Sequence, residues 1–125
     1  MKNISYSNLS EKEFYYGVNL RSNCRYKYDE DFKIIVVNSK KVSLQAYGVD
    51  ISVSGMGFKS EAELKENDMV EIIFKFAGIS ILTIARIAHS SLFDKGFFYG
   101  CQFIAIQNLY RDILKGNLKQ QIENN

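Results

Sequence analysis

The stretch Asp50–Gly55 reads DISVSG, an Asp-x-Ser-x-x-Gly spacing that lies between two predicted strands. Upstream of it, Arg21–Arg25 reads RSNCR and contains two of the chain's four arginines. Each spacing by itself is common by chance at ordinary residue frequencies. Their order along the chain, with one predicted strand pair between them, makes the combination informative.

Length and composition predict one compact domain, and the segment before it is expected to form an N-terminal arm. The chain has 125 residues, of which 46% are hydrophobic and 14% aromatic, and it contains no proline. A chain of this size can bury one core but has no room for a separate catalytic domain. We place the arm at residues 1–19 and the domain at residues 20–125. The net charge of +2 is dispersed along the chain, which disfavours a nucleic-acid polymer as a partner and indicates that any phosphate is bound at a local site.

The two cysteines, Cys24 and Cys101, predict free thiols in a reducing compartment. The sequence contains no Cys-x-x-Cys and no second His or Cys cluster, so no metal site is expected. No apolar run is long enough for a spanning helix, and the N-terminus has no apolar signal-peptide core. We therefore expect a cytoplasmic protein without membrane insertion.

Hydrophobic alternation predicts an all-β domain. β-Branched and aromatic residues recur in short runs that are separated by turn signals such as Asn38-Ser39, Ala77-Gly78 and Asp94-Lys95-Gly96. The expected strands cover residues 32–37, 41–47 with a continuation into Asp50, 55–60, 68–76, 79–89 and 97–105.

Helices are expected only near the two ends of the chain. The strand at 79–89 is apolar on both faces and needs a cover. The cover is predicted to be a C-terminal helix that follows Asn108 as its N-cap, with an apolar stripe made of Leu109, Ile113, Leu118 and Ile122. In the arm, a capping box at Ser10–Glu13 predicts a short aromatic helix over Phe14, Tyr15 and Tyr16.

The two motifs together resemble the signature of the PilZ domain, the bacterial receptor module for cyclic di-GMP. The resemblance extends over about residues 20–120 and includes the tracts Arg86-Ile87-Ala88 and Tyr99–Phe103. It implies a six-stranded antiparallel β-barrel with a C-terminal α-helix across one opening, in agreement with the predicted strands. It also implies a role in second messenger signalling, with cyclic di-GMP as the ligand and no other cofactor.

On the family pattern, Arg21 and Arg25 bind the phosphates and a guanine of the ligand. A guanidinium group can hold a phosphate bidentately or meet the O6/N7 edge of guanine, and lysine cannot reproduce that geometry. How the two arginines divide these tasks is left open. Without the downstream motif, the simpler interpretation is two solvated arginines before a strand.

Asp50, Ser52 and Gly55 complete the predicted binding residues. A carboxylate at Asp50 suits the adjacent N1–H and N2 amino donors of guanine, and Ser52 adds a hydroxyl two residues later. Gly55 permits a positive φ or a close approach of the backbone to a ligand. The alternative is an Asp-Ser-Gly turn that only joins two strands.

Neighbouring residues qualify the predicted mode of binding. Leu20, before the first arginine, cannot add a phosphate contact, so one ligand molecule per chain is expected. Tyr26 and Tyr28 either stack on guanine or pack in the core. The single histidine, His89, is expected to cap a strand end, and no catalytic set is found, so the protein is not expected to be an enzyme.

The sequence thus predicts a cyclic di-GMP receptor or adaptor whose partner surface changes when the nucleotide orders the N-terminal arm. The expected protein partner belongs to motility, adhesion or exopolysaccharide machinery. One rival is a PilZ-like interaction module without nucleotide affinity. A second is a small β-barrel that binds single-stranded nucleic acid, which the dispersed charge disfavours.

Overall fold

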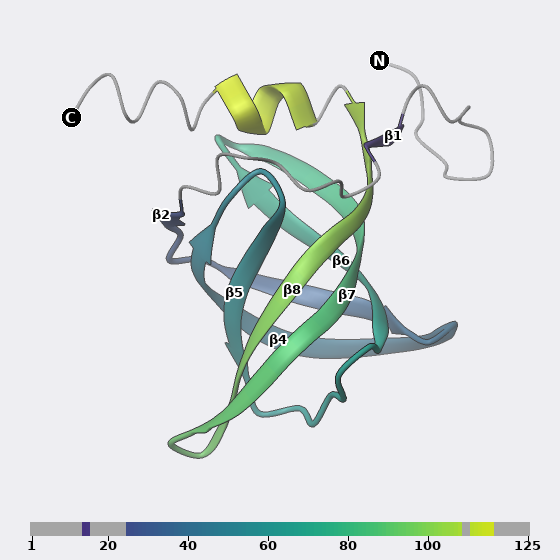
Figure 1. Cartoon of the computed structure of the whole chain (residues 1–125), viewed down its shortest axis with the longest axis vertical. Coiled ribbons are helices and arrows are strands. Elements are labelled where there is room, and N and C mark those ends of the chain that lie inside the picture. The colour runs from purple at the N-terminus through teal and green to yellow at the C-terminus, as the bar shows by residue number, and fades with distance from the viewer. Residues whose placement is uncertain (1–13, 16–24, 109–110, 117–125) are drawn as a thin grey trace.

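The computed structural model of the chain describes residues 14–15, 25–108 and 111–116 and contains a closed antiparallel β-barrel (Figure 1). The barrel strands follow the order β8-β5-β4-β3-β6-β7, and the pairing of β7 with β8 closes the ring. Their bounds are β3 Asp31–Val37, β4 Lys40–Ile51, β5 Gly55–Ser60, β6 Met69–Phe76, β7 Ile79–Phe93 and β8 Gly96–Gln107. The predicted six-stranded all-β barrel is therefore confirmed.

Two of the predicted turns are tight hairpin connections. Asn38 and Ser39 between β3 and β4 have φ angles of 49° and 73°, and Ala77 and Gly78 between β6 and β7 have 54° and 78°. Two successive left-handed residues are typical of the two-residue turns whose twist matches that of the flanking strands. These turns set the register of both hairpins, in which Val37 faces Lys40 and Phe76 faces Ile79.

The inward side chains of the barrel form one aromatic core. Phe58 contacts both Phe32 and Tyr99 through ring centroids 5.4 and 5.3 Å apart, and Phe74 stacks on Phe103 at 5.9 Å. The Tyr99 hydroxyl donates a hydrogen bond to the Ala62 carbonyl and accepts one from the Leu64 amide, each at 2.7 Å. Tyr99 therefore ties the loop after β5 to the core.

Tyr28 also packs in the core, which decides between its two predicted roles. Only 5% of the residue is exposed, and its ring lies where a side chain at Gly48 would otherwise be. Its hydroxyl donates to the Lys75 carbonyl, and burial raises its pKa. The segment that enters the barrel is thus anchored at Tyr28, three residues after Arg25.

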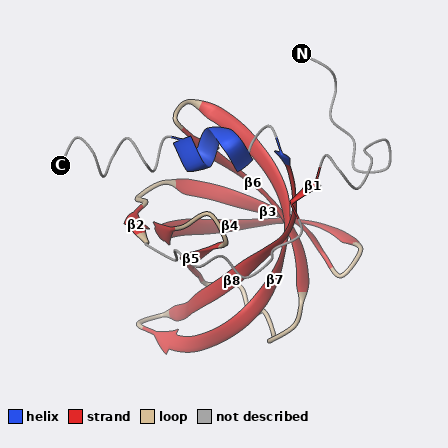
Figure 2. Cartoon of the chain, turned by 45° about the horizontal axis from the view of Figure 1, so that its top comes forward, coloured by secondary structure: helices blue, strands red, loops and turns tan. Residues whose placement is uncertain are grey.

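A short helix lies across one end of the barrel, as predicted (Figures 1 and 2). Its described residues are 108 and 111–116, so Asn108 is already helical rather than the N-cap. The buried helical residue is Leu114, which is fully inaccessible and belongs to the core cluster, whereas Ile113 of the predicted stripe is half-buried. Among the described residues, no helix has both the length and the apolar character needed to cross a membrane.

The described part of the helix does not lie over the outer face of β7, where the sequence predicts the cover. Leu109, Leu118 and Ile122 of the predicted stripe lie outside the described residues. The helix closes the barrel end, where Leu114 meets the inward side chains, while Leu82 and Ile84 on the other face of β7 remain half-buried. Alternate residues of a strand point to opposite faces, so an element at the end of a barrel can bury only the inward set.

The arm contains a strand where the sequence predicts a short helix. Phe14 and Tyr15 form β1 (Phe14–Tyr15), which pairs antiparallel with β8 opposite Gln107 and Ile106. Aromatic residues favour strands, and pairing with the end of β8 satisfies their backbone groups. The capping box at Ser10–Glu13 and Tyr16 lie outside the described residues, and the domain boundary near residue 19 stays a prediction.

Cys101 is a free, buried thiol in β8, as predicted. Burial raises its pKa to about 12, so the reactive thiolate is scarce at neutral pH. Cys24 lies outside the described residues.

Replacing Tyr99 by Phe should lower the free energy of unfolding by about 1–3 kcal/mol, because the buried Leu64 amide loses its acceptor. Urea denaturation measures this change. Tyr47→Phe is the matched control, since Tyr47 is 39% exposed and its hydroxyl should contribute little. Equal stabilities of the two variants would contradict the assigned role of the Tyr99 hydroxyl.

Candidate functional site

The predicted binding residues gather where the entering segment meets β4. The short strand β2 (Tyr26–Lys27) pairs with the end of β4, with Tyr26 opposite Ile51 and Lys27 opposite Asp50. On its other side, β4 pairs with β5, and the register shifts between Gly48 and Asp50. A register shift of this kind bends a strand and redirects its side chains. Asp50 is thereby placed between β2 and β5.

Asp50 is the centre of a polar cluster. Its Oδ1 atom accepts hydrogen bonds from Nε of Arg25 at 2.9 Å and from the Gly57 amide at 3.0 Å, and Nη2 of Arg25 lies 2.7 Å from the same oxygen. The Arg25 and Asp50 side chains are 41% and 31% exposed. Among the described residues, no donor meets Oδ2 of Asp50.

Ser52 and Gly55 have structural contacts in the turn after β4. Ser52 is fully buried, its amide donates to the Gly55 carbonyl at 2.9 Å, and its Oγ accepts from the Ser54 amide at 3.2 Å. Gly55 is not among the residues with positive φ, and a side chain there would clash with the Cys101 carbonyl. The sequence suggests either a positive φ or a close backbone approach as the reason for glycine at position 55. The close approach applies, and the backbone that comes close is that of β8.

The structure therefore brings Arg25 and Asp50 together and places Ser52 and Gly55 in the turn beside them. Arg21 and Leu20 lie outside the described residues, so their roles stay predictions. Tyr26 packs against the core, as Tyr28 does. This packing agrees with the interpretation that the two tyrosines belong to the core and do not stack on a base.

Sequence reasoning missed Gly57. A methyl group at this position would lie 2.8 Å from Oδ1 of Asp50 and 3.1 Å from Cζ of Phe98. Glycine is needed there because the Asp50 carboxylate and the Phe98 ring occupy that space. The sequence shows this glycine two residues after Gly55. Its contact with Asp50 follows only from the pairing of β5 with β4 and β8.

His89 lies inside β7 and does not cap its end, which corrects the sequence prediction. β7 continues to Phe93, and His89 is opposite Gly100 of β8. The exposed imidazole lies over Gly100, where a side chain would clash with it, and it stacks on Phe98 with ring centroids 6.4 Å apart. The described residues include no cluster of three His, Cys, Asp or Glu residues suited to a metal ion.

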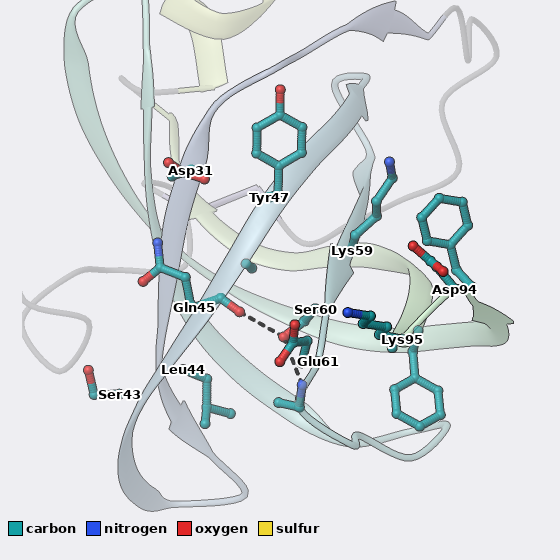
Figure 3. A pocket seen from close by; sticks show the side chains of 15 residues that line it. Asp31, Ser43, Leu44, Gln45, Tyr47, Lys59, Ser60, Glu61, Asp94 and Lys95 are labelled. Atoms are coloured by element: carbon teal, nitrogen blue, oxygen red, sulfur yellow. Dashed lines mark hydrogen bonds between the residues drawn. The ribbon is translucent and has the colours of Figure 1, made fainter.

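A separate cleft of about 620 Å³ lies between β4, the end of β5 and the β7–β8 hairpin (Figure 3). Its lining includes Tyr47, Lys59, Glu61 and Phe93, and Nζ of Lys59 lies 4.3 Å from the centre of the Phe93 ring. Of the predicted binding residues that the structure describes, namely Arg25, Asp50, Ser52 and Gly55, none lines this cleft.

A protein-family model described as the PilZ domain matches residues 19–120. The chain belongs to the PilZ family. PilZ domains are cyclic di-GMP-binding and adaptor modules, and some of them lack the nucleotide-binding activity. The matched range includes both arginines of the first motif and the whole Asp50–Gly55 stretch. The comparison with curated proteins gives no match.

The contacts of this PilZ domain predict different stability effects for the two charged residues. Asp50→Ala should lower the free energy of unfolding by about 1–3 kcal/mol because the buried Gly57 amide loses its acceptor. Arg25→Ala should cost less than about 1 kcal/mol, since the ion pair is partly exposed.

Asp50→Asn is the matched control, because an amide oxygen can still accept from Gly57. Chemical denaturation of the three variants tests the assignment. An Asp50→Ala protein as stable as the wild type would show that the Gly57 hydrogen bond contributes nothing to the fold.

Proposed function

We propose that the protein is a cyclic di-GMP receptor that acts as an adaptor. The observation that supports this proposal is the partly exposed Arg25–Asp50 pair, in which the three donors from the described residues all meet Oδ1 and none of them meets Oδ2. A receptor for this ligand needs a planar cation for phosphate or guanine and a carboxylate for the guanine donors. The pair supplies both groups at one point on the outer surface of the barrel.

The ion pair also prepares the two groups for binding. Arg25 orients the carboxylate from one side, and the Gly57 amide holds it from the other side. Oδ2 can then accept from the N1–H or N2 amino group of guanine, while the remaining guanidinium N–H groups meet a phosphate oxygen. Arg21 is the proposed second cation, which follows from the family motif.

The proposed output is a change in the surface that the arm presents to a protein partner. Arg25 and β2 come just before β3, the first barrel strand, and Lys27 of β2 lies opposite Asp50. A ligand held by Arg21, Arg25 and Asp50 connects the segment before residue 25 to the barrel face, and the ordering of that segment must be offset by charge-assisted contacts. The proposed partner is a cytoplasmic protein of motility, adhesion or exopolysaccharide machinery.

The rival function, an interaction module without nucleotide affinity, differs in one measurable property. In that case, the Arg25–Asp50 pair would be a surface ion pair with no ligand, and a titration would give no heat. We propose no catalytic activity.

Isothermal titration calorimetry should detect selective binding of cyclic di-GMP. Cyclic di-AMP should bind about 5- to 150-fold more weakly than cyclic di-GMP. Adenine lacks the N1–H and N2 amino donors, so Asp50 receives no hydrogen bond from the base, at a cost of about 1–3 kcal/mol. Equal affinity for the two nucleotides would contradict the assigned role of Asp50.

The same titration, applied to variants, tests whether the charged residues contribute to ligand binding rather than to folding. Arg21→Ala and Arg25→Ala should each weaken binding by about 1.5–3 kcal/mol, roughly 10- to 150-fold, without unfolding the protein. Asp50→Asn is preferable to Asp50→Ala for this test because it keeps an acceptor for the Gly57 amide. Lys33→Ala, an exposed position on β3, is the control and should bind as the wild type does.

Hydrogen exchange should slow between residues 19 and 25 when cyclic di-GMP is added, because the ligand connects this segment to the barrel. The amides of β6, β7 and β8 should change little, since their protection comes from the closed sheet. Unchanged exchange at residues 19–25 with saturating ligand would show that the nucleotide does not act through the arm.

A further inference from the structure

One row of paired residues crosses four adjacent strands on the outer face of the barrel. Asp50 of β4 faces Gly57 of β5, Gly57 faces Gly100 of β8, and Gly100 faces His89 of β7. Residues directly opposite one another in a sheet project to the same face. Asp50 and His89 therefore flank two adjacent positions that carry no side chain.

Aromatic rings lie over both glycines. The Phe98 ring approaches Gly57 from β8, with Cζ 3.1 Å from where a methyl group would be, and Oδ1 of Asp50 is 2.8 Å from the same point. The Phe98 ring and the Asp50 carboxylate are thus neighbours. The His89 imidazole covers Gly100 and stacks on Phe98 at an interplanar angle of 30°.

This combination has the properties of a nucleobase site. His89 is exposed and Phe98 is half-buried, so the rings are open to a ligand rather than enclosed in the core. Stacking on an aromatic ring uses the face of a base, whereas the carboxylate of Asp50 reads its edge. Two glycines in the middle of neighbouring strands weaken the strands, and such glycines mark places where a ligand or a side chain comes close to the backbone.

We propose that Phe98, extended by His89, is a stacking platform for one guanine of cyclic di-GMP. The base lies on the Phe98 ring with its N1–H and N2 edge toward Oδ2 of Asp50, and Arg25 meets the adjoining phosphate. This assignment rests on the proposed function and adds the residues that hold the face of the base. Neither residue belongs to the two sequence motifs.

The chain contains no tryptophan, so one introduced indole reports directly on stacking. Phe98→Trp should retain the affinity for cyclic di-GMP, and its fluorescence should be quenched on binding because a guanine stacks on the indole. Phe93→Trp is the matched control, since Phe93 is an exposed aromatic in the separate cleft and its indole should keep its fluorescence.

Affinity by calorimetry is the second measurement. Phe98→Ala should weaken cyclic di-GMP binding about 5- to 150-fold, the range expected for the loss of one base–aromatic stack. Phe98→Leu keeps an apolar side chain against the barrel yet should also weaken binding, which separates the loss of the ring from misfolding. His89→Ala should have a smaller effect in the same direction.

The outcomes distinguish the platform from the function itself. In one outcome, the wild type binds cyclic di-GMP while Phe98→Trp shows no quenching and Phe98→Leu binds with normal affinity. That result overturns the platform and leaves the receptor function intact. Quenching of Phe93→Trp instead would place the ligand in the cleft and also overturn the platform. An absence of wild-type binding, with Phe98→Trp folded by circular dichroism, overturns both proposals.

Discussion

The pairing of β8 with both β5 and β7 is the constraint on which the rest of the structure depends. It joins the two ends of the sheet, and closure leaves one inward face for the aromatic core and one outward face that carries the candidate site. It also sets the register that brings Gly57, Gly100 and His89 into one row. A shift of β8 by one residue would move its outward side chains to the inside and remove the candidate site.

Asp50 shows how the same residue can serve the fold and the proposed ligand. One carboxylate oxygen is used by Arg25 and by the Gly57 amide, which connects the entering segment, β4 and β5. The other oxygen has no donor among the described residues. The described contacts of Ser52 and Gly55 are structural, because Ser52 is buried in the turn and Gly55 lies against the Cys101 carbonyl. Their predicted contacts with a ligand stay predictions.

The errors in the sequence predictions have a common physical origin. Phe14 and Tyr15 have strand propensity, and the end of β8 gives their backbone a partner that local sequence does not reveal. Leu114, and not Ile113, enters the core because the angle at which the helix crosses the barrel end decides which side meets it. The sequence predicts that His89 lies at a strand end because the apolar alternation stops near residue 89. The strand β7 nevertheless continues to Phe93, because it stays paired with β8 in the hairpin.

The sequence by itself determined the six strands, their tight turns and the identity of two motifs that mark the PilZ family. These features are local, since alternation, turn residues and short spacings act over a few neighbouring residues. Only the tertiary structure decided that Arg25 lies on Asp50, that Gly57 supports this carboxylate, that Phe98 lies beside it, and that His89 stacks on Phe98. These contacts join residues far apart in the chain, and they exist only after the pairing of β4, β5, β8 and β7 has set which residues face one another.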